Sequence, residues 1–229
     1  NAQTGDRLAT NGGTLEISAD SKGDKVSLDG DFSSIAVTSK NQVEQPVLFT
    51  LNGLKLKGDT HLSPEGVRVG DQSISLDKLN ASVNGQEGLV LEKLNTKSSF
   101  DNKDGKIGGN LDMTVDKISL QKQPFGEAKL AMKFAQFDAQ AVKTFSDSYN
   151  AQMQDLLNQP GVVEDPVRYQ ASVQTTLKNN LPTLLKGAPS VSIPPPFWKN
   201  DKGESTFNLN IGFNDSATVS GDALQLGAA

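Results

Sequence analysis

The chain contains no cysteine. This absence excludes thiol catalysis, zinc–thiolate and iron–sulfur sites, and disulfide cross-links. Histidine occurs once, at His61, so a catalytic triad would depend on this one imidazole and a metal site would need other ligands. His61 lies in a turn-rich stretch, and we interpret it as a surface residue. No apolar stretch reaches the ~18–20 residues that a membrane-spanning helix requires.

Runs of basic residues are also missing. The 27 acidic and 22 basic residues are mixed along the chain and give a formal charge of −5. This excludes the basic surface by which proteins hold nucleic acid. Tryptophan and tyrosine are scarce beside ten phenylalanines, which indicates aromatic residues that fill a core. Hydrophobic residues make up 35% of the chain, a share that favours antiparallel strands with one solvated face.

What the sequence does contain is a short recurrent pattern of two apolar residues separated by two polar or small ones. It occurs at Phe32–Ile35, Leu51–Leu54, Leu76–Leu79, Leu91–Leu94, Val115–Ile118 and Phe134–Phe137. The surrounding apolar residues alternate with period two, as in half-buried strands. A step of three would turn the second apolar residue to the wrong face, and a β-bulge would restore it. Six such sites predict strands that bend, and hence a sheet that curves along its length.

Residues 14–137 are predicted to form an antiparallel β-meander. Turn signals such as Asn84-Gly85 and Asp104-Gly105 separate the alternating segments. The spacing between copies of the pattern alternates between short and long, as in a meander whose strands are crossed off-centre by one line of bends. A solenoid would give equal spacing. The strands implied are about 15 residues long, well above the usual five or six.

Residues 138–187 change to helical spacing and predict a pair of helices on one face of the sheet. Asp138 is the expected N-cap of the first, which should stop at 158–161. Its apolar stripe consists of Val142, Phe145, Tyr149, Met153 and Leu156. The second should start at Asp165-Pro166, break or kink near Asn180 because of Pro182, and close at Gly187.

The C-terminal part returns to strand spacing. Residues 188–214 predict a β-hairpin that lies at a sheet edge, because the three prolines at 194–196 cannot belong to a central strand. Residues 215–229 form a small, polar tail. The predicted fold class is therefore α+β, a single domain with a long curved antiparallel meander, a helix pair and a C-terminal edge hairpin.

Three stretches carry a family resemblance: residues 54–66, residues 170–187 and the segment from Trp198 to Phe207. They are similar to the YdgA-like family of uncharacterised bacterial envelope proteins. The resemblance extends over most of the chain and corresponds to the C-terminal part of a longer family protein. It implies a periplasmic body tethered to the inner membrane by an N-terminal span. The chain begins at Asn1 without Met, so we expect such an anchor to lie upstream. The family supplies no catalytic residues.

Candidate chemistry is sparse. Residues 101–107 resemble the middle of a calcium loop, but Phe100 and Leu111 stand where its first and last ligands should be, so we expect a hairpin turn. We predict no catalytic, cofactor-binding or metal-binding residues and no cofactor. The weak candidates for ligand binding are Phe145, Tyr149, Phe197 and Trp198, which would line an apolar groove between helices and sheet. The alternative is that these four aromatic residues fill the core.

Two functional hypotheses follow. The first is a non-enzymatic periplasmic domain for envelope maintenance that binds a lipid-like ligand or a protein partner. AsmA-like curved-sheet proteins, which cradle acyl chains, offer an analogy at the level of fold. The second is a structural module that forms a homodimer through exposed sheet edges. A hydrolase would need a set of residues that the sequence does not show. Contact with the membrane is expected only through the missing anchor.

Overall fold

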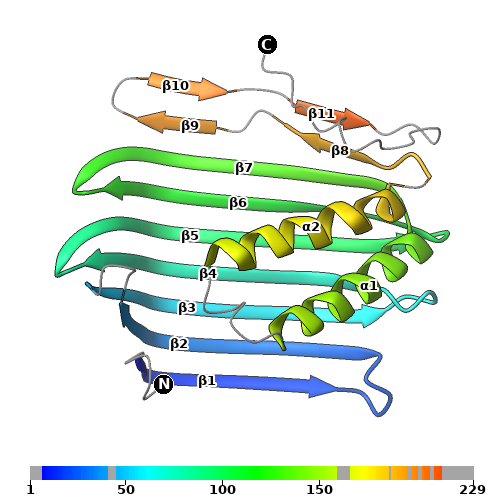
Figure 1. Cartoon of the computed structure of the whole chain (residues 1–229), viewed down its shortest axis with the longest axis horizontal. Helices are drawn as coiled ribbons and strands as arrows, with labels where there is room; N and C mark the ends of the chain where they lie inside the picture. The colour runs from blue at the N-terminus through cyan, green and yellow to red at the C-terminus, as the bar shows by residue number, and fades with distance from the viewer. Residues whose placement is uncertain are drawn as a thin grey trace.

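The computed structural model of the chain describes residues 7–40, 45–158, 166–185, 187–194, 197–200, 203–206 and 209–212. These residues form an 11-stranded sheet with two helices on one of its faces (Figure 1). The predicted α+β class and the long curved meander are confirmed. The predicted tail, residues 215–229, lies outside the described residues.

Seven long strands make up most of the sheet. They are β1 (Arg7–Ala19), β2 (Lys25–Lys40), β3 (Pro46–Leu62), β4 (Arg68–Val83), β5 (Gln86–Lys103), β6 (Lys106–Leu120) and β7 (Gln123–Asp138). Each pairs antiparallel with the next in sequence. Their lengths of 13 to 18 residues match the expectation, although β1 starts before residue 14. The turns at Asn84-Gly85 and Asp104-Gly105 have two positive φ angles each, as a type I′ hairpin requires.

The repeated four-residue pattern stacks across the sheet. Ile35 pairs with Leu51, Leu51 with Leu79, Leu79 with Leu91, and Leu91 with Ile118. Thr10–Gly13 of β1 aligns with the same line, because Thr10 pairs with Ile35 and Gly13 with Phe32. We call this stack of six segments, 10–13, 32–35, 51–54, 76–79, 91–94 and 115–118, the break line. Within it the ladder is interrupted, and Gly12, Gly53 and Lys93 have φ angles of 65°, 64° and 57°.

The break line corrects one expectation. The register is the same on both sides of it in every strand pair from β1 to β6, so the four copies on β2 to β5 are not β-bulges. The copy Val115–Ile118 keeps its register toward β5 but is bulged toward β7, where Asp116 and Lys117 stand opposite Glu127 alone. Neighbouring strands share the interruption, and a shared interruption needs no change of register. The sixth copy, Phe134–Phe137, does form a bulge: Ala135 and Gln136 stand opposite Gly108 alone. It lies away from the break line, where β7 meets the first helix.

The two faces of the sheet differ in character. Phe100 and Phe134 pack against the same buried cluster as the helix residues Val142 and Leu184, so their face is the one beneath the helices. Strand alternation extends this face along the sheet. One of its cross-strand rows consists of Leu15, Gly30, Leu56, Ile74, Thr96, Met113 and Leu130. We call it the apolar face and the opposite one the polar face.

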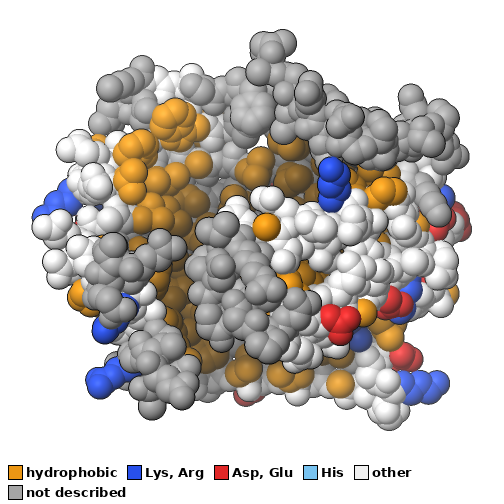
Figure 2. Space-filling model, in the orientation of Figure 1, with side chains coloured by type: hydrophobic (Ala, Val, Ile, Leu, Met, Phe, Trp, Pro, Cys, Tyr) orange, Lys and Arg blue, Asp and Glu red, His pale blue; other side chains and the backbone are white. Residues whose placement is uncertain are grey.

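The apolar face continues past the break line. The residues Ile35, Leu51, Leu79, Leu91 and Ile118 form the next cross-strand row. Figure 2 shows hydrophobic side chains gathered over the left half of the sheet on the helix side, where these parts of the strands lie. Likewise Phe134 and Phe137 both pack in the core beneath the helices, with ring centroids 6.2 Å apart. The three-residue step therefore keeps apolar side chains on one face, as the sequence indicated.

The helices are α1 (Ala139–Leu157) and α2 (Pro166–Leu184). Asp138 is the N-cap of α1, accepting a hydrogen bond from the amide of Ala141 at 3.0 Å, and Asn158 is its C-cap. The expected break near Asn180 is wrong, because α2 continues through Pro182 to Leu184. Pro182 lies in the final turn, where the missing N–H costs one hydrogen bond at a helix end. Asp165 lies outside the described residues.

Four short strands complete the sheet: β8 (Ser190–Ile193), β9 (Phe197–Asn200), β10 (Gly203–Thr206) and β11 (Leu209–Gly212). β9 and β10 form the predicted edge hairpin. Both β8 and β9 pair with β7, and the proline segment separates them. The prolines thus fall between two short strands, each of which has a further strand, β11 or β10, on its other side.

Candidate functional site

The helices are anchored at one end of the apolar face. Val69, Ile107, Phe137 and Ala139 form the buried cluster there. The amide of Ala139 donates to the carbonyl of Gly105 at 2.9 Å, and Lys106 forms an ion pair with Asp138 at 3.2 Å. α1 approaches the sheet at β6 and β7, and α2 packs chiefly against α1. From this anchor the pair extends across the sheet, as Figure 1 shows.

Part of the apolar face stays open beyond this anchor. Ile74 and Met113 lie in the same cross-strand row and are 45% and 38% exposed, whereas Leu76 and Val115, two residues further along the same strands, are 4% and 7% exposed. On this side of the molecule, Figure 2 shows hydrophobic side chains in a recess over the left half of the sheet. A contiguous open apolar surface marks a binding surface more often than isolated apolar residues do. We call this feature the apolar hollow.

The structure separates the four predicted aromatic candidates into two pairs. Phe145 and Tyr149 stack on α1 with ring centroids 5.9 Å apart and planes 10° from parallel. Phe197 and Trp198 lie on β9 at the sheet edge. There, Lys129 Nζ lies 5.2 Å from the Phe197 ring centroid, and the Trp198 indole donates to the carbonyl of Phe125 at 2.7 Å. Only the first pair lies on a helix above the apolar face, whereas Trp198 is part of the sheet itself, paired with Ala128. A role of any of the four in ligand binding stays a prediction.

Phe145 and Tyr149 face the sheet. They share one helical stripe with Val142, which packs against the buried cluster beneath α1. Both rings are half-buried. We therefore assign the two rings to a wall of the apolar hollow, and Ile74 and Met113, which are exposed on the same side of the sheet, to its floor. The sequence placed Phe145 and Tyr149 on the inner stripe of the helix, but the alternation of apolar residues does not tell which residues of the sheet a helix covers.

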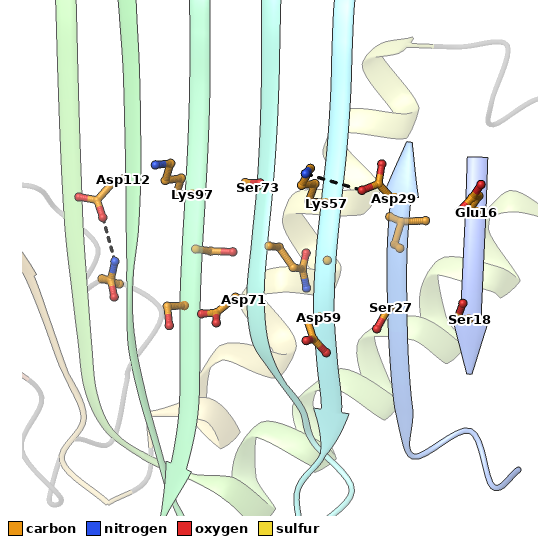
Figure 3. A pocket seen from close by; sticks show the side chains of 16 residues that line it. Glu16, Ser18, Ser27, Asp29, Lys57, Asp59, Asp71, Ser73, Lys97 and Asp112 are labelled. Carbon is orange, nitrogen blue, oxygen red and sulfur yellow. Dashed lines mark hydrogen bonds and ion pairs between the residues drawn. The ribbon is translucent and has the colours of Figure 1, made fainter. Parts of the chain in front are cut away.

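The polar face carries a second hollow, of about 640 Å³, which the sequence reasoning missed. Figure 3 shows its side chains in two cross-strand rows. One row contains Glu16, Asp29, Lys57, Ser73, Lys97 and Asp112, and the other contains Ser18, Ser27, Asp59, Asp71, Ser99 and Asn110. Lys57 forms an ion pair with Asp29 at 3.7 Å. Such exposed pairs contribute little to stability, and this face acts mainly as a hydrated surface.

Charged residues also mark the break line. Lys93 Nζ lies 2.6 Å from Asp77 Oδ1, and Lys117 Nζ lies 3.2 Å from Glu92 Oε1. The hydrogen bond from Lys93, with the attraction of its charge, lowers the pKa of Asp77 below its usual value. The same pair raises the pKa of Lys93. These residues form exposed ion pairs at the positions where the ladder is interrupted.

The remaining polar candidates have structural positions. His61 is an exposed residue near the end of β3. The calcium-like segment 101–107 is the β5–β6 hairpin, as predicted. Across the described ranges, no group of three or more acidic, histidine or cysteine side chains is placed to hold a metal ion. Neither α1 nor α2 is apolar enough for a membrane span, as judged on the residues that the structure describes.

A long open meander with an apolar face toward a helix pair and a polar face toward solvent defines this chain as a curved-sheet α+β protein. It belongs to the family described as bacterial protein of unknown function DUF945, whose profile matches residues 1–227. The chain is 38% identical over 219 residues to Protein YdgA of Escherichia coli strain K12, a match covering 95% of this chain and 44% of that protein. The resemblance to YdgA-like proteins is thereby confirmed.

A second relative is more distant. The chain is 28% identical over 175 residues to Uncharacterized protein YihF of the same strain, a match covering 75% of this chain and 36% of that protein. The chain thus spans less than half the length of these two relatives. No solved structure matches it significantly.

Proposed function

We propose that this domain is a non-enzymatic periplasmic part of an inner-membrane-tethered protein, and that it serves envelope maintenance by holding an acyl chain of a lipid in the apolar hollow. The observation that carries the proposal is the exposure of Ile74 and Met113 beside the buried Leu76 and Val115. On the same face of β4 and β6, the side chain at one position is buried and the side chain two residues away is exposed. The apolar face therefore has an opening at Ile74 and Met113.

The shape of this opening favours a chain-like occupant. Its floor is the apolar face and its wall is the Phe145–Tyr149 stack. Seven strands at ~4.8 Å spacing give the apolar face a width of about 29 Å. An acyl chain occupies one leaflet, about 15 Å deep, so the face accommodates one at full length. A folded protein partner would need a broad accessible surface, and the helices lie over part of this one.

The location and the tether are supported by the family. The resemblance to YdgA-like proteins implies an envelope location, and the curated relatives are more than twice as long as this chain. In this proposal the membrane tether belongs to the remainder of such a longer protein.

Ligand displacement tests the hollow directly. Purified protein is titrated with a fluorescent dansyl fatty acid and then competed with phosphatidylglycerol or phosphatidylethanolamine. We expect saturable binding by the unmodified chain and at least a tenfold loss of affinity for Ile74→Asp and Met113→Asp, because a carboxylate in the hollow must be desolvated. Ser73→Asp is the matched control: it adds the same charge next to Ile74 but on the polar face, and it should bind normally.

Circular dichroism and thermal unfolding establish that each variant is folded. The proposal is wrong if the unmodified protein shows no saturable binding. It is also wrong if folded Ile74→Asp and Met113→Asp variants bind the probe as tightly as Ser73→Asp does.

A further inference from the structure

The outer edge of β1 is the long open edge of the sheet. All 13 residues of β1 are exposed, with Leu8, Leu15 and Ile17 at 70%, 53% and 64%. The strand has no proline and no lysine, and its only charged residues are Arg7 and Glu16. By contrast, the corresponding edge of β7 is covered by β8 and β9. Natural sheets usually protect a long edge with lysines, prolines or a covering element, and β1 has none of these among the described residues.

We propose that β1 pairs antiparallel with β1 of a second copy of this chain, in the register that places segment 10–13 of one copy against segment 13–10 of the other. The break line decides this register. Across every strand pair from β1 to β6, the four residues of one segment face the four residues of the next in reverse order. A strand added outside β1 must interrupt its ladder at the same place if its apolar residues are to stay on one face.

The side chains of β1 fit the same register independently. Leu8 faces Leu15 of the second copy, so two exposed leucines cover each other, and the two-fold axis repeats this contact. Arg7 faces Glu16 of the second copy, also twice. A shift of two residues in either direction sets Arg7 against Thr14 or Ser18 and loses both charge pairs.

The charges next to Glu16 in its own chain also favour a cation from the second copy. Within its own chain it pairs across the ladder with Asp29, a like charge. The nearest ion pair in that row joins Asp29 to Lys57 at 3.7 Å and leaves Glu16 outside it. Arg7 of the second copy would place the two adjacent acids, Glu16 and Asp29, between two cations, itself and Lys57, on the polar face. The dimer would also join the apolar faces of two meanders into one surface, whether or not that face binds lipid.

Charge reversal tests the pairing by sedimentation equilibrium. Arg7→Glu and Glu16→Arg should each raise the dimer dissociation constant at least tenfold, because each sets two pairs of like charges in contact. The double variant restores opposite charges and should return to within threefold of the unmodified chain. Lys103→Glu, an exposed lysine in the β5–β6 turn, controls for net charge and should have no effect.

Disulfide cross-linking tests the register itself. Because the chain has no cysteine, each variant carries one thiol at a known position. Ala9 faces Thr14 of the second copy in the proposed pairing. A mixture of Ala9→Cys and Thr14→Cys chains should form mixed disulfides on mild oxidation at least tenfold faster than either variant forms them with itself.

Several results would overturn the proposal. One is a chain that stays monomeric at about 0.5 mM, a concentration at which even weak specific complexes associate. Others are a dimer that is indifferent to both charge reversals, or preferential self-cross-linking. Slow hydrogen exchange, in a monomer, of those β1 amides that do not bond to β2 would show that another part of the same chain covers the edge, and would equally contradict the proposal.

Discussion

A Cβ atom on Gly53 would lie 2.3 Å from Oδ2 of Asp77, the residue that faces it on the neighbouring strand. Gly53 has a φ of 64°, in the region that favours glycine. Asp77 in turn accepts a hydrogen bond from Lys93 on the strand beyond. Gly53, Asp77 and Lys93 therefore lie next to one another on three neighbouring strands of the break line. The side chain of Asp77 leaves no room for a Cβ atom at position 53, and Lys93 binds the Asp77 carboxylate.

Gly53→Ala should destabilise the protein by about 3 kcal/mol, because it adds a steric conflict with Asp77 to the cost of a left-handed alanine. Gly23→Ala is the matched control. Gly23 has a φ of 74° but open space around its Cβ position, so only the backbone cost of roughly 1 kcal/mol remains. Urea denaturation measures both free energies of unfolding. Equal losses in the two variants would show that Asp77 does not restrict position 53.

The covered and open parts of the apolar face should respond differently to truncation. Leu76→Ala removes a buried side chain and should cost about 2–5 kcal/mol. Ile74→Ala, two residues away on the same face, should cost less than about 1 kcal/mol because its side chain is half exposed. Chemical denaturation of both variants checks this. A loss at Ile74 as large as that at Leu76 would place it in a closed core and remove the apolar hollow.

Asp138 should stabilise the start of α1 by its capping hydrogen bond. Asp138→Ala should cost about 1 kcal/mol, while Asp138→Asn, which keeps an acceptor oxygen, should cost less. Hydrogen bonds from backbone amides, first that of Ala141, and then from Lys106 lower the pKa of Asp138. A lowered pKa means that this contribution is present above the ordinary aspartate pKa and is lost as the pH falls through the lowered value. The free energies of unfolding of the unmodified chain and of Asp138→Ala should therefore become equal as the pH falls from 6 to 2, as measured by chemical denaturation.

The Asp77–Lys93 pair predicts a coupled titration. Lys93→Met should raise the pKa of Asp77 toward its ordinary value, because it removes the hydrogen bond and the charge that lower that pKa. Carboxyl NMR chemical shifts between pH 2 and pH 7 report it. The pKa of Lys93 is raised, so the stabilisation that its charged form contributes is fully present below the ordinary lysine pKa. This stabilisation is lost only as the pH rises through the raised pKa. An unchanged Asp77 titration in Lys93→Met would show that the two side chains do not interact in solution.

The meander and the first helix were predictable because local residue patterns determine them. Period-two alternation with a step of three identified the segments of the break line, and Asp138 with the stripe from Val142 to Leu156 identified α1. The bulge interpretation failed for the copies on β2 to β5 because one strand cannot reveal its partner: a bulge and a shared interruption look the same in a single segment. Phe134–Phe137 is a bulge because Gly108 stands alone opposite it.

The candidate site was predictable only in part. Sequence spacing placed Phe145 and Tyr149 on the inner stripe of α1, and the structure agrees. Trp198 and Phe197 looked equivalent as aromatic residues, but β9 joins the sheet edge beside β7. The exposure of Ile74 depends on how the helices extend from the anchor at Ala139 and Gly105. That geometry arises from tertiary contacts that no single segment encodes.

Native mass spectrometry of the protein purified from a bacterial envelope fraction tests the apolar hollow most directly. We expect a protein ion that retains lipid mass, and a folded Ile74→Asp variant, prepared in parallel, that has lost it. Protein without ligand in both preparations would show that the apolar hollow does not hold lipid, as would equal retention of lipid by the variant.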